Sequence, residues 1–303
     1  MQQDNGALMD VISIKRGHLA MLLFSFLIAG SFSFGTRIAN LMEPAAMMAL
    51  RFAIAGVLVG TIAALGPGFK RKYFNAPWRY LLLGGLFAIY FGLMFEGLKT
   101  ASPVSASAVF TLTPIMSAVF GYFLLRQITT PWMFCALLIG AVGAVWVIFR
   151  GDISALIAFD IGHGEAIFFV GCIAHALYTP LVRKLHMGEP IVVFTFGMIV
   201  AGFLVLAALG SPELMQTNWV VLPWHFWAGL LYLAIFASSI TFFLVQYATM
   251  YLPSAKVMAY TYLTPSWVIM WEFVLTGNVP PALMFLGVSA TVVALVMLLR
   301  NEP

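Results

Sequence analysis

His175 and Tyr178 are the residues of this 303-residue chain with the clearest capacity for binding or proton-transfer chemistry. They lie three positions apart, a spacing that puts both side chains on one face of a helix. Histidine changes its charge near neutral pH, so it can bind a polar ligand or respond to protonation. A histidine inside a helix also packs in many proteins without any such role, and the spacing leaves both interpretations open.

Further hydroxyl and aromatic side chains lie deep within apolar stretches of the sequence. A cavity walled by rings and a few hydroxyls suits a planar apolar ligand with a polar end, because ring faces contribute about 0.5–2 kcal/mol each through stacking or cation–π contacts. Serine and threonine also mediate close helix packing in membranes, so each assignment has that alternative. The expected substrate-binding residues are Ser33, Tyr90, Thr113, His175, Tyr178, Thr241, Tyr260 and Trp267.

The elements that position these residues follow from composition. Hydrophobic residues make up 62% of the chain and charged residues 9%, whereas about a quarter of residues are charged in soluble proteins. A spanning helix needs roughly 20 mostly apolar residues, so the sequence predicts an all-α integral membrane protein. The ten expected transmembrane helices cover residues 19–39, 44–65, 78–98, 103–125, 131–149, 163–183, 190–209, 223–247, 254–276 and 281–299.

Lysine and arginine are unevenly divided between the two sides of this arrangement. With a cytoplasmic N-terminus, ten basic residues near helix ends fall on the cytoplasmic side, and only Arg37, Lys99 and Arg150 fall on the other. Basic residues accumulate on the cytoplasmic side of membrane proteins. We therefore expect a multi-pass protein of the cell inner membrane, with a cytoplasmic N-terminal tail (1–18) and C-terminus (300–303).

Internal repetition divides the chain in two. Glu43-Pro44 recurs as Glu189-Pro190 at an offset of 146 residues, and Leu112-Thr113-Pro114 recurs as Leu263-Thr264-Pro265 at an offset of 151. Each half holds five helices, and an odd number makes the second copy enter the membrane from the opposite side. Such inverted repeats place a substrate site near the membrane midplane, between halves that rock. The expected units are a five-helix repeat over 19–149, a connecting loop over 150–162 and an inverted five-helix repeat over 163–299, with a central cavity.

Pro114 and Pro265 fall about midway along their predicted helices. Proline removes a backbone donor and clashes with the preceding turn, which kinks a helix, and Ser or Thr hydroxyls can satisfy the freed carbonyl. A static bend is one interpretation of the pair. The matching positions in the two repeats favour a second interpretation, a paired hinge at the substrate site.

The stretches from Gly97 to Pro114 and from Tyr247 to Pro265 resemble the twin signature of the drug/metabolite transporter superfamily, EamA type. Within it, the chain as a whole most resembles the YddG-type exporters of aromatic amino acids. The resemblance implies a ten-helix bundle with both termini cytoplasmic and a central cavity lined mainly by helices 1, 3, 4, 6, 8 and 9. One feature differs, because many members carry a glutamate about 13 residues after each proline, where this chain has Gln127 and Asn278.

Charged side chains inside hydrocarbon are costly and point to function by default. Arg51 lies about seven residues inside the second span, and the sequence favours its pairing with a carboxylate such as Glu43 or Glu272. Lys256 lies two residues inside the ninth span and can extend to the interface. Cys135 and Cys172 both fall within spans, which favours apolar packing over a disulfide or a metal cluster.

The function expected is export of aromatic and other amino acids and related small metabolites by alternating access. The expected protein is a monomer in the lipid bilayer that is not an enzyme and takes no cofactor, metal or nucleic acid. A broad drug/metabolite or nucleotide-sugar carrier on the same fold is the nearest alternative. An intramembrane protease would need a serine nucleophile with a partnered histidine, or an H-E-x-x-H helix, and neither H-E-x-x-H nor G-x-S-x-G occurs. A channel would normally carry rings or loops of selectivity groups.

Overall fold

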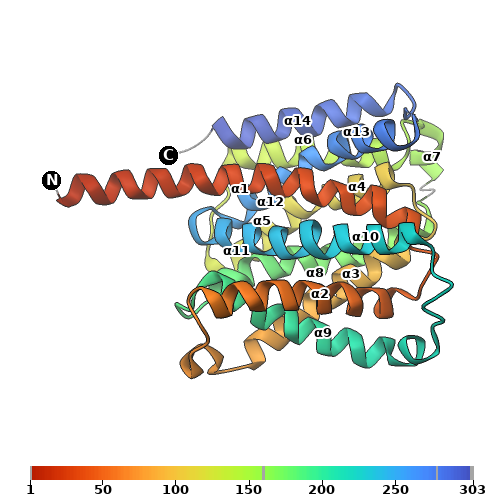
Figure 1. Cartoon of the computed structure of the whole chain (residues 1–303). Helices are drawn as coiled ribbons and strands as arrows, with labels where there is room; N and C mark the ends of the chain where they lie inside the picture. The colour runs from red at the N-terminus through yellow and green to blue at the C-terminus, as the bar shows by residue number, and fades with distance from the viewer. Residues whose placement is uncertain (1, 159–160, 278, 301–303) are drawn as a thin grey trace.

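The computed structural model describes residues 2–158, 161–277 and 279–300, with side chains from residue 13 onward, and these residues form helices and no strand. The helices lie side by side in a bundle, and their connections gather at its two ends (Figure 1). Asn278, one of the two positions at which many family members carry a glutamate, lies outside the described residues. The helices are α1 (Gln2–Ile38), α2 (Pro44–Leu65), η1 (Arg71–Phe74), α3 (Trp78–Gly97), α4 (Pro103–Phe110), α5 (Thr113–Leu125), α6 (Pro131–Ile148), α7 (Ile153–Ala158), α8 (His163–Leu185), α9 (Ile191–Gln216), α10 (Trp224–Ala234), the π-helix η2 (Ile235–Ile240), α11 (Thr241–Tyr251), α12 (Ser254–Ala259), η3 (Tyr260–Leu263), α13 (Thr264–Thr276) and α14 (Met284–Arg300).

Eight helical stretches of the described chain are long and apolar enough to cross a membrane. They confirm the first eight predicted spans in position, with ends that differ by up to seven residues. The predicted ninth span is divided among α12, η3 and α13, and the predicted tenth is α14, an apolar helix of 17 residues. The eight stretches are Ser13–Ile38, Pro44–Leu65, Trp78–Gly97, Pro103–Leu125, Pro131–Ile148, His163–Leu185, Ile191–Gln216 and Trp224–Tyr251.

Three helix starts are explained by proline and the residue before it. Pro44, Pro103 and Pro131 each open a helix, where the missing N–H would have had no partner within the helix. Glu43 accepts a hydrogen bond from the Ala46 N–H at 3.0 Å, and the side chains before Pro103 and Pro131 cap their helices in the same way.

Glycines let helices distant in the sequence approach closely. Helix α6 packs against α14, where a Cβ added to Gly143 would lie 2.6 Å from the Gly287 carbonyl oxygen, and one added to Gly287 would lie 2.6 Å from that of Gly143. Helix α2 packs against α9, and α3 against both α8 and α9. Small residues of this kind bring membrane helices into van der Waals contact. Cys172 is buried in this packing, whereas Cys135 is exposed, so the packing role expected for Cys135 was wrong.

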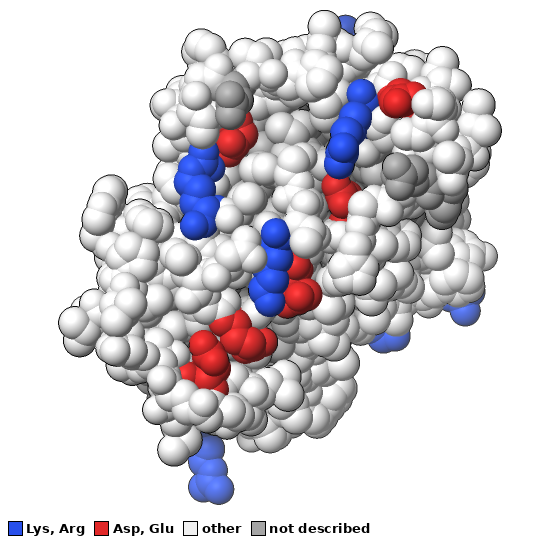
Figure 2. Space-filling view, turned by 90° about the vertical axis from the view of Figure 1, so that its right-hand side faces the viewer, with Lys and Arg blue, Asp and Glu red and all other residues white. Residues whose placement is uncertain are grey.

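The two ends of the bundle carry different ion pairs. At the end shown in Figure 2, the basic side chains in the foreground lie beside acidic ones, and Arg37 pairs with Glu272 at 3.1 Å. At the opposite end, Arg79 at the start of α3 pairs with Glu189, just before α9, at 2.8 Å. The Arg79–Glu189 pair is buried, and each pair joins helices from distant parts of the sequence.

Candidate functional site

A cluster of rings fills the centre of the bundle where α3, α4, α8 and α11 meet. Its side chains are at most 4% exposed, so they are shut off from solvent. Neighbouring ring centroids lie between 3.9 and 6.4 Å apart, the range in which aromatic rings attract one another. This aromatic cluster consists of Phe87, Tyr90, Phe91, Phe110, Phe168, His175, Tyr178 and Phe242.

His175 lies inside the aromatic cluster. Its ring centroid is 4.5 Å from that of Tyr90, 5.2 Å from that of Phe110 and 5.6 Å from that of Phe87. Among the described residues, neither His175 Nδ1 nor the Tyr90 hydroxyl has a hydrogen-bond partner, although both atoms are buried. An unpartnered buried polar group costs about 1–3 kcal/mol. These two groups, on neighbouring rings, would therefore gain hydrogen bonds from a ligand with a polar end.

Tyr178 shares the helix face of His175, as their spacing predicts, and its ring stacks on Phe87 with centroids 3.9 Å apart. Its hydroxyl accepts a hydrogen bond from Gln246 at 3.0 Å, and the Gln246 side-chain oxygen accepts one from Thr195 at 2.6 Å. Gln246 thus joins α8, α9 and α11. Sequence reasoning missed it, although an amide within an apolar span was an available signal.

Arg51 does not pair with either carboxylate that the sequence suggested. Glu43 caps α2, and Glu272 pairs with Arg37. The Arg51 side chain is instead fully buried, and its guanidinium lies 4.0 Å from the ring centroid of Phe91, at the edge of the aromatic cluster. Lys256 is also buried, at 6% exposure, so the expectation that it extends to the interface was wrong.

The α-helices that carry Pro114 and Pro265 are interrupted just before the prolines. The chain turns at residues 111–112 and through η3, and each proline lies in the first turn of the following helix. Proline fits there because its missing N–H has no partner in that turn. The carbonyl of Phe110, which would have bonded to residue 114, accepts a hydrogen bond from the Thr113 hydroxyl at 2.7 Å, as predicted. The Thr113 hydroxyl also lies 3.3 Å from that of Thr261, so the two broken helices meet at this point.

Thr113 and its repeat partner Thr264 are expected to respond differently to the loss of their hydroxyls. Thr113→Val should lower the free energy of unfolding by about 1 kcal/mol, because the hydrogen bond to Phe110 is lost. Thr264→Val should leave it unchanged or raise it, because the buried Thr264 hydroxyl has no partner among the described residues. Thermal unfolding of both purified variants in detergent measures the difference, and equal destabilisation would contradict this explanation.

The other predicted site residues occupy separate places. The Tyr260 hydroxyl lies 2.9 Å from His18 Nδ1, and the Trp267 indole N–H donates to Ser25 at 3.1 Å, so both residues contact α1. The Thr241 hydroxyl donates weakly to the Ser238 carbonyl at 3.4 Å. Ser33 is fully buried on α1, and its hydroxyl has no partner in the described part of the chain.

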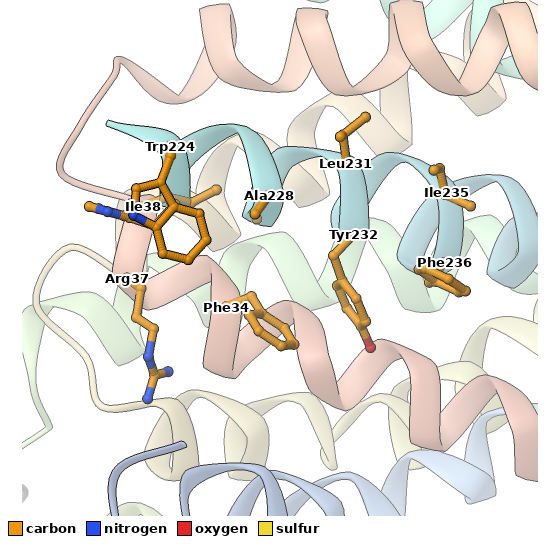
Figure 3. Close-up of a pocket in the computed structure, with 11 residues that line it drawn as sticks. Phe34, Arg37, Ile38, Trp224, Ala228, Leu231, Tyr232, Ile235 and Phe236 are labelled. Carbon is orange, nitrogen blue, oxygen red and sulfur yellow. The ribbon is translucent and has the colours of Figure 1, made fainter. Parts of the chain in front are cut away.

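A pocket of about 760 Å³ lies apart from the aromatic cluster, between α1 and α10. Figure 3 shows Phe34, Arg37 and Tyr232 along it. The Tyr232 hydroxyl already donates to the Leu27 carbonyl at 2.9 Å, and Arg37 pairs with Glu272. Other lining residues are exposed on the outside of the bundle, so this pocket offers an apolar surface for lipid rather than a polar site for a substrate.

Eight long apolar helices, packed around buried polar groups that have no partner among the described residues, indicate a multi-pass membrane protein. The chain belongs to the EamA-like transporter family, whose model matches residues 15–149 and, separately, residues 163–300.

Individual relatives agree with this assignment. The chain is 26% identical over 228 residues to the uncharacterized transporter YyaM of Bacillus subtilis (strain 168), covering 73% of each protein. It is 25% identical over 260 residues to the uncharacterized transporter YcxC of the same organism, covering 82% of this chain and 81% of YcxC. A crystal structure aligned over 97% of this chain and 99% of its own has a TM-score of 0.72 at 22% identity, which shows a shared fold.

Proposed function

We propose that this protein exports aromatic amino acids, other amino acids and related small metabolites across the cell inner membrane by alternating access. The observation that carries the proposal is the aromatic cluster with its two unpartnered polar atoms, Tyr90 Oη and His175 Nδ1. Rings supply stacking surfaces for an aromatic side chain, and the polar atoms supply hydrogen bonds for the polar end of an amino acid.

The architecture that we propose is ten transmembrane helices in two inverted five-helix repeats, with the substrate site between them. Support comes from the two separate matches of one family model to this chain. Helices α1 and α8 also start at opposite ends of the bundle (Figure 1). The corresponding helices α2 and α9 pack against each other, as do α6 and α14. Inverted repeats of this kind let one half rock against the other around a fixed site.

The ion pairs at the two ends are the contacts that we expect to open in turn. Arg37–Glu272 and Arg79–Glu189 each join one proposed repeat to the other, and they lie at opposite ends. In the cycle that we propose, the arrangement with both pairs formed and the aromatic cluster closed is the occluded state. The excess of basic residues at the Arg79 end favours a cytoplasmic location for that end and for both termini.

Uptake into proteoliposomes tests the substrate. Purified protein is reconstituted, labelled phenylalanine is supplied, and unlabelled tryptophan, threonine and a nucleotide sugar serve as competitors, with and without a pH gradient. We expect saturable uptake that tryptophan inhibits most strongly. Inhibition by the nucleotide sugar alone would favour a nucleotide-sugar carrier, and product formation would indicate an enzyme.

Tyr90→Phe separates a substrate-binding role from a packing role. The variant removes only a hydroxyl that has no partner in the described structure, so the stability should be unchanged or higher. If the hydroxyl binds substrate, the KM for phenylalanine should rise by about five- to tenfold. Tyr178→Phe is the matched control, because it removes a hydroxyl that already accepts a bond from Gln246 and should lower stability instead. An unchanged KM in Tyr90→Phe would remove Tyr90 from the site.

A further inference from the structure

Arg51 is a buried cation for which the described residues provide no counter-ion. Its side chain is 0% exposed on α2, within a predicted membrane span. No carboxylate of the described residues forms an ion pair with it. A charge inside a membrane is costly, and such residues usually pair with an opposite charge or act on a substrate.

The contacts of the guanidinium are all with neutral groups. Nε donates to the Ser238 hydroxyl at 2.5 Å, and Nη2 donates to the Ala237 carbonyl at 2.5 Å. The partner of Nη1 is the Met48 sulfur at 3.7 Å, which is a weak acceptor. A guanidinium carries five N–H donors, so these contacts leave some donors unused and bring no negative charge to the cation.

The polar contacts of Arg51 are made with an irregular helical segment. Ser238 and Ala237 belong to the π-helix η2, which interrupts the apolar stretch Trp224–Tyr251 near its middle. The Ser238 and Ser239 hydroxyls donate to carbonyls five residues earlier, at 2.9 and 2.8 Å. Single π-helical turns inside α-helices are frequent at functional sites. The polar contacts of Arg51 are thus made with a segment near the midplane that has irregular backbone.

Arg51 also adjoins the aromatic cluster. Its guanidinium carbon lies 4.0 Å from the Phe91 ring centroid, the Phe91 and Tyr90 centroids are 4.6 Å apart, and the Tyr90 and His175 centroids are 4.5 Å apart. A cation, two unpartnered polar atoms and several ring faces therefore lie in one continuous region. This set matches a ligand that has a carboxylate at one end and an aromatic ring at the other.

We propose that Arg51 binds the carboxylate of the transported substrate, and that the protein therefore selects carboxylate-bearing aromatic molecules over their amides and amines. The proposal rests on the proposed function, since it assigns a substrate class to the same site. Arginine binds a carboxylate through two parallel N–H···O bonds, which gives direction as well as attraction. A free carboxylate supplies the negative charge that the surroundings of Arg51 lack.

Ligand-induced thermal stabilisation in detergent tests this without transport. The wild-type protein is titrated with 3-phenylpropionate, phenylalanine, phenylalaninamide and phenethylamine, and with chloride as a simple anion. We expect the two carboxylates to stabilise at concentrations at least about tenfold lower than the amide and the amine. Equal effects of phenylalanine and phenylalaninamide would overturn the proposal, as would stabilisation by chloride alone.

Variants at position 51 locate the effect. Arg51→Gln should abolish the preference for phenylalanine over phenylalaninamide, and Arg51→Lys, which keeps the charge without the planar fork, should reduce it. Lys99→Gln is the control, because it removes a partly exposed cation that pairs with Glu96 and should keep the full preference.

If Arg51→Gln does not fold, Arg51→Lys and the wild-type titration still decide between the outcomes. A carboxylate preference that persists in both folded variants would overturn the role of Arg51. Carboxylate binding without any phenylalanine transport would instead refute the proposed function and leave the anion site standing.

Discussion

Replacing Gly84 with leucine is expected to prevent α3 from packing against α9 and to abolish the folded protein or lower its melting temperature by roughly 10 °C. A Cβ at this position would lie 2.5 Å from the Gly202 nitrogen and 2.6 Å from the Met198 carbonyl oxygen. These are backbone atoms in α9, so no side-chain rotation relieves the collision. The helices would have to move apart, which would disturb the aromatic cluster that α3 carries.

Gly85→Leu is the matched control for Gly84→Leu, because it changes the next residue of the same helix in the same way. A Cβ at Gly85 meets no atom within 4 Å. Both variants lose a glycine and gain a leucine, so helix propensity and hydrophobicity change alike. Fluorescence-detected size exclusion and thermal unfolding report the difference, and comparable behaviour of the two variants would mean that the close approach of α3 to α9 is wrong.

Arg79→Gln is expected to lower the free energy of unfolding by about 3–5 kcal/mol, because it leaves the Glu189 carboxylate buried without its cation. The side chains of Arg79 and Glu189 are only 3% and 2% exposed. Arg79 also donates to the carbonyls of Leu185 at 2.5 Å and Asn75 at 3.1 Å, so the variant disconnects three segments at this end of the bundle.

The comparison for Arg79→Gln is Lys99→Gln, which breaks the Lys99–Glu96 pair at the other end of α3. The Lys99 and Glu96 side chains are 29% and 44% exposed, and an exposed pair contributes about 0–1 kcal/mol. Adding Glu189→Gln to Arg79→Gln should restore part of the lost stability, because no buried charge then remains unpaired. Thermal or denaturant unfolding measures all four proteins. Similar losses for Arg79→Gln and Lys99→Gln would contradict the buried pair.

Much of the fold could be predicted because hydropathy and proline act locally. Pro44, Pro103 and Pro131 open helices at the predicted residues, since a helix start is where proline fits. The divisions within spans were less predictable. A proline marks a break only approximately, so the turns before Pro114 and Pro265 were placed a few residues late. The π-helix at Ile235–Ile240 has no sequence signature, because its residues are as apolar as their neighbours.

At the candidate site, spacing along one helix was informative and pairing between helices was not. His175 and Tyr178 lie on one face, as three-residue spacing requires. The partner of Arg51 was mispredicted because Arg37, in the last turn of α1, takes Glu272, whereas Arg51 lies seven residues inside α2. Tyr260 and Trp267 had suitable side chains, but their hydrogen bonds run to His18 and Ser25 on α1. Such choices depend on the packing of α1 against α13, which sequence periodicity does not specify.

Counterflow tests the central claim, that this chain is a carrier for aromatic amino acids, most directly. Proteoliposomes are loaded with unlabelled tryptophan or with buffer, and entry of labelled phenylalanine is followed over time. An alternating-access carrier should accumulate label transiently and faster when tryptophan is inside, because the binding site then carries tryptophan out as it reorients. Tyr90→Phe should weaken this response. The claim would be contradicted if label entry did not saturate with either internal solution and did not depend on internal tryptophan. That result would indicate a channel, or a substrate of another class.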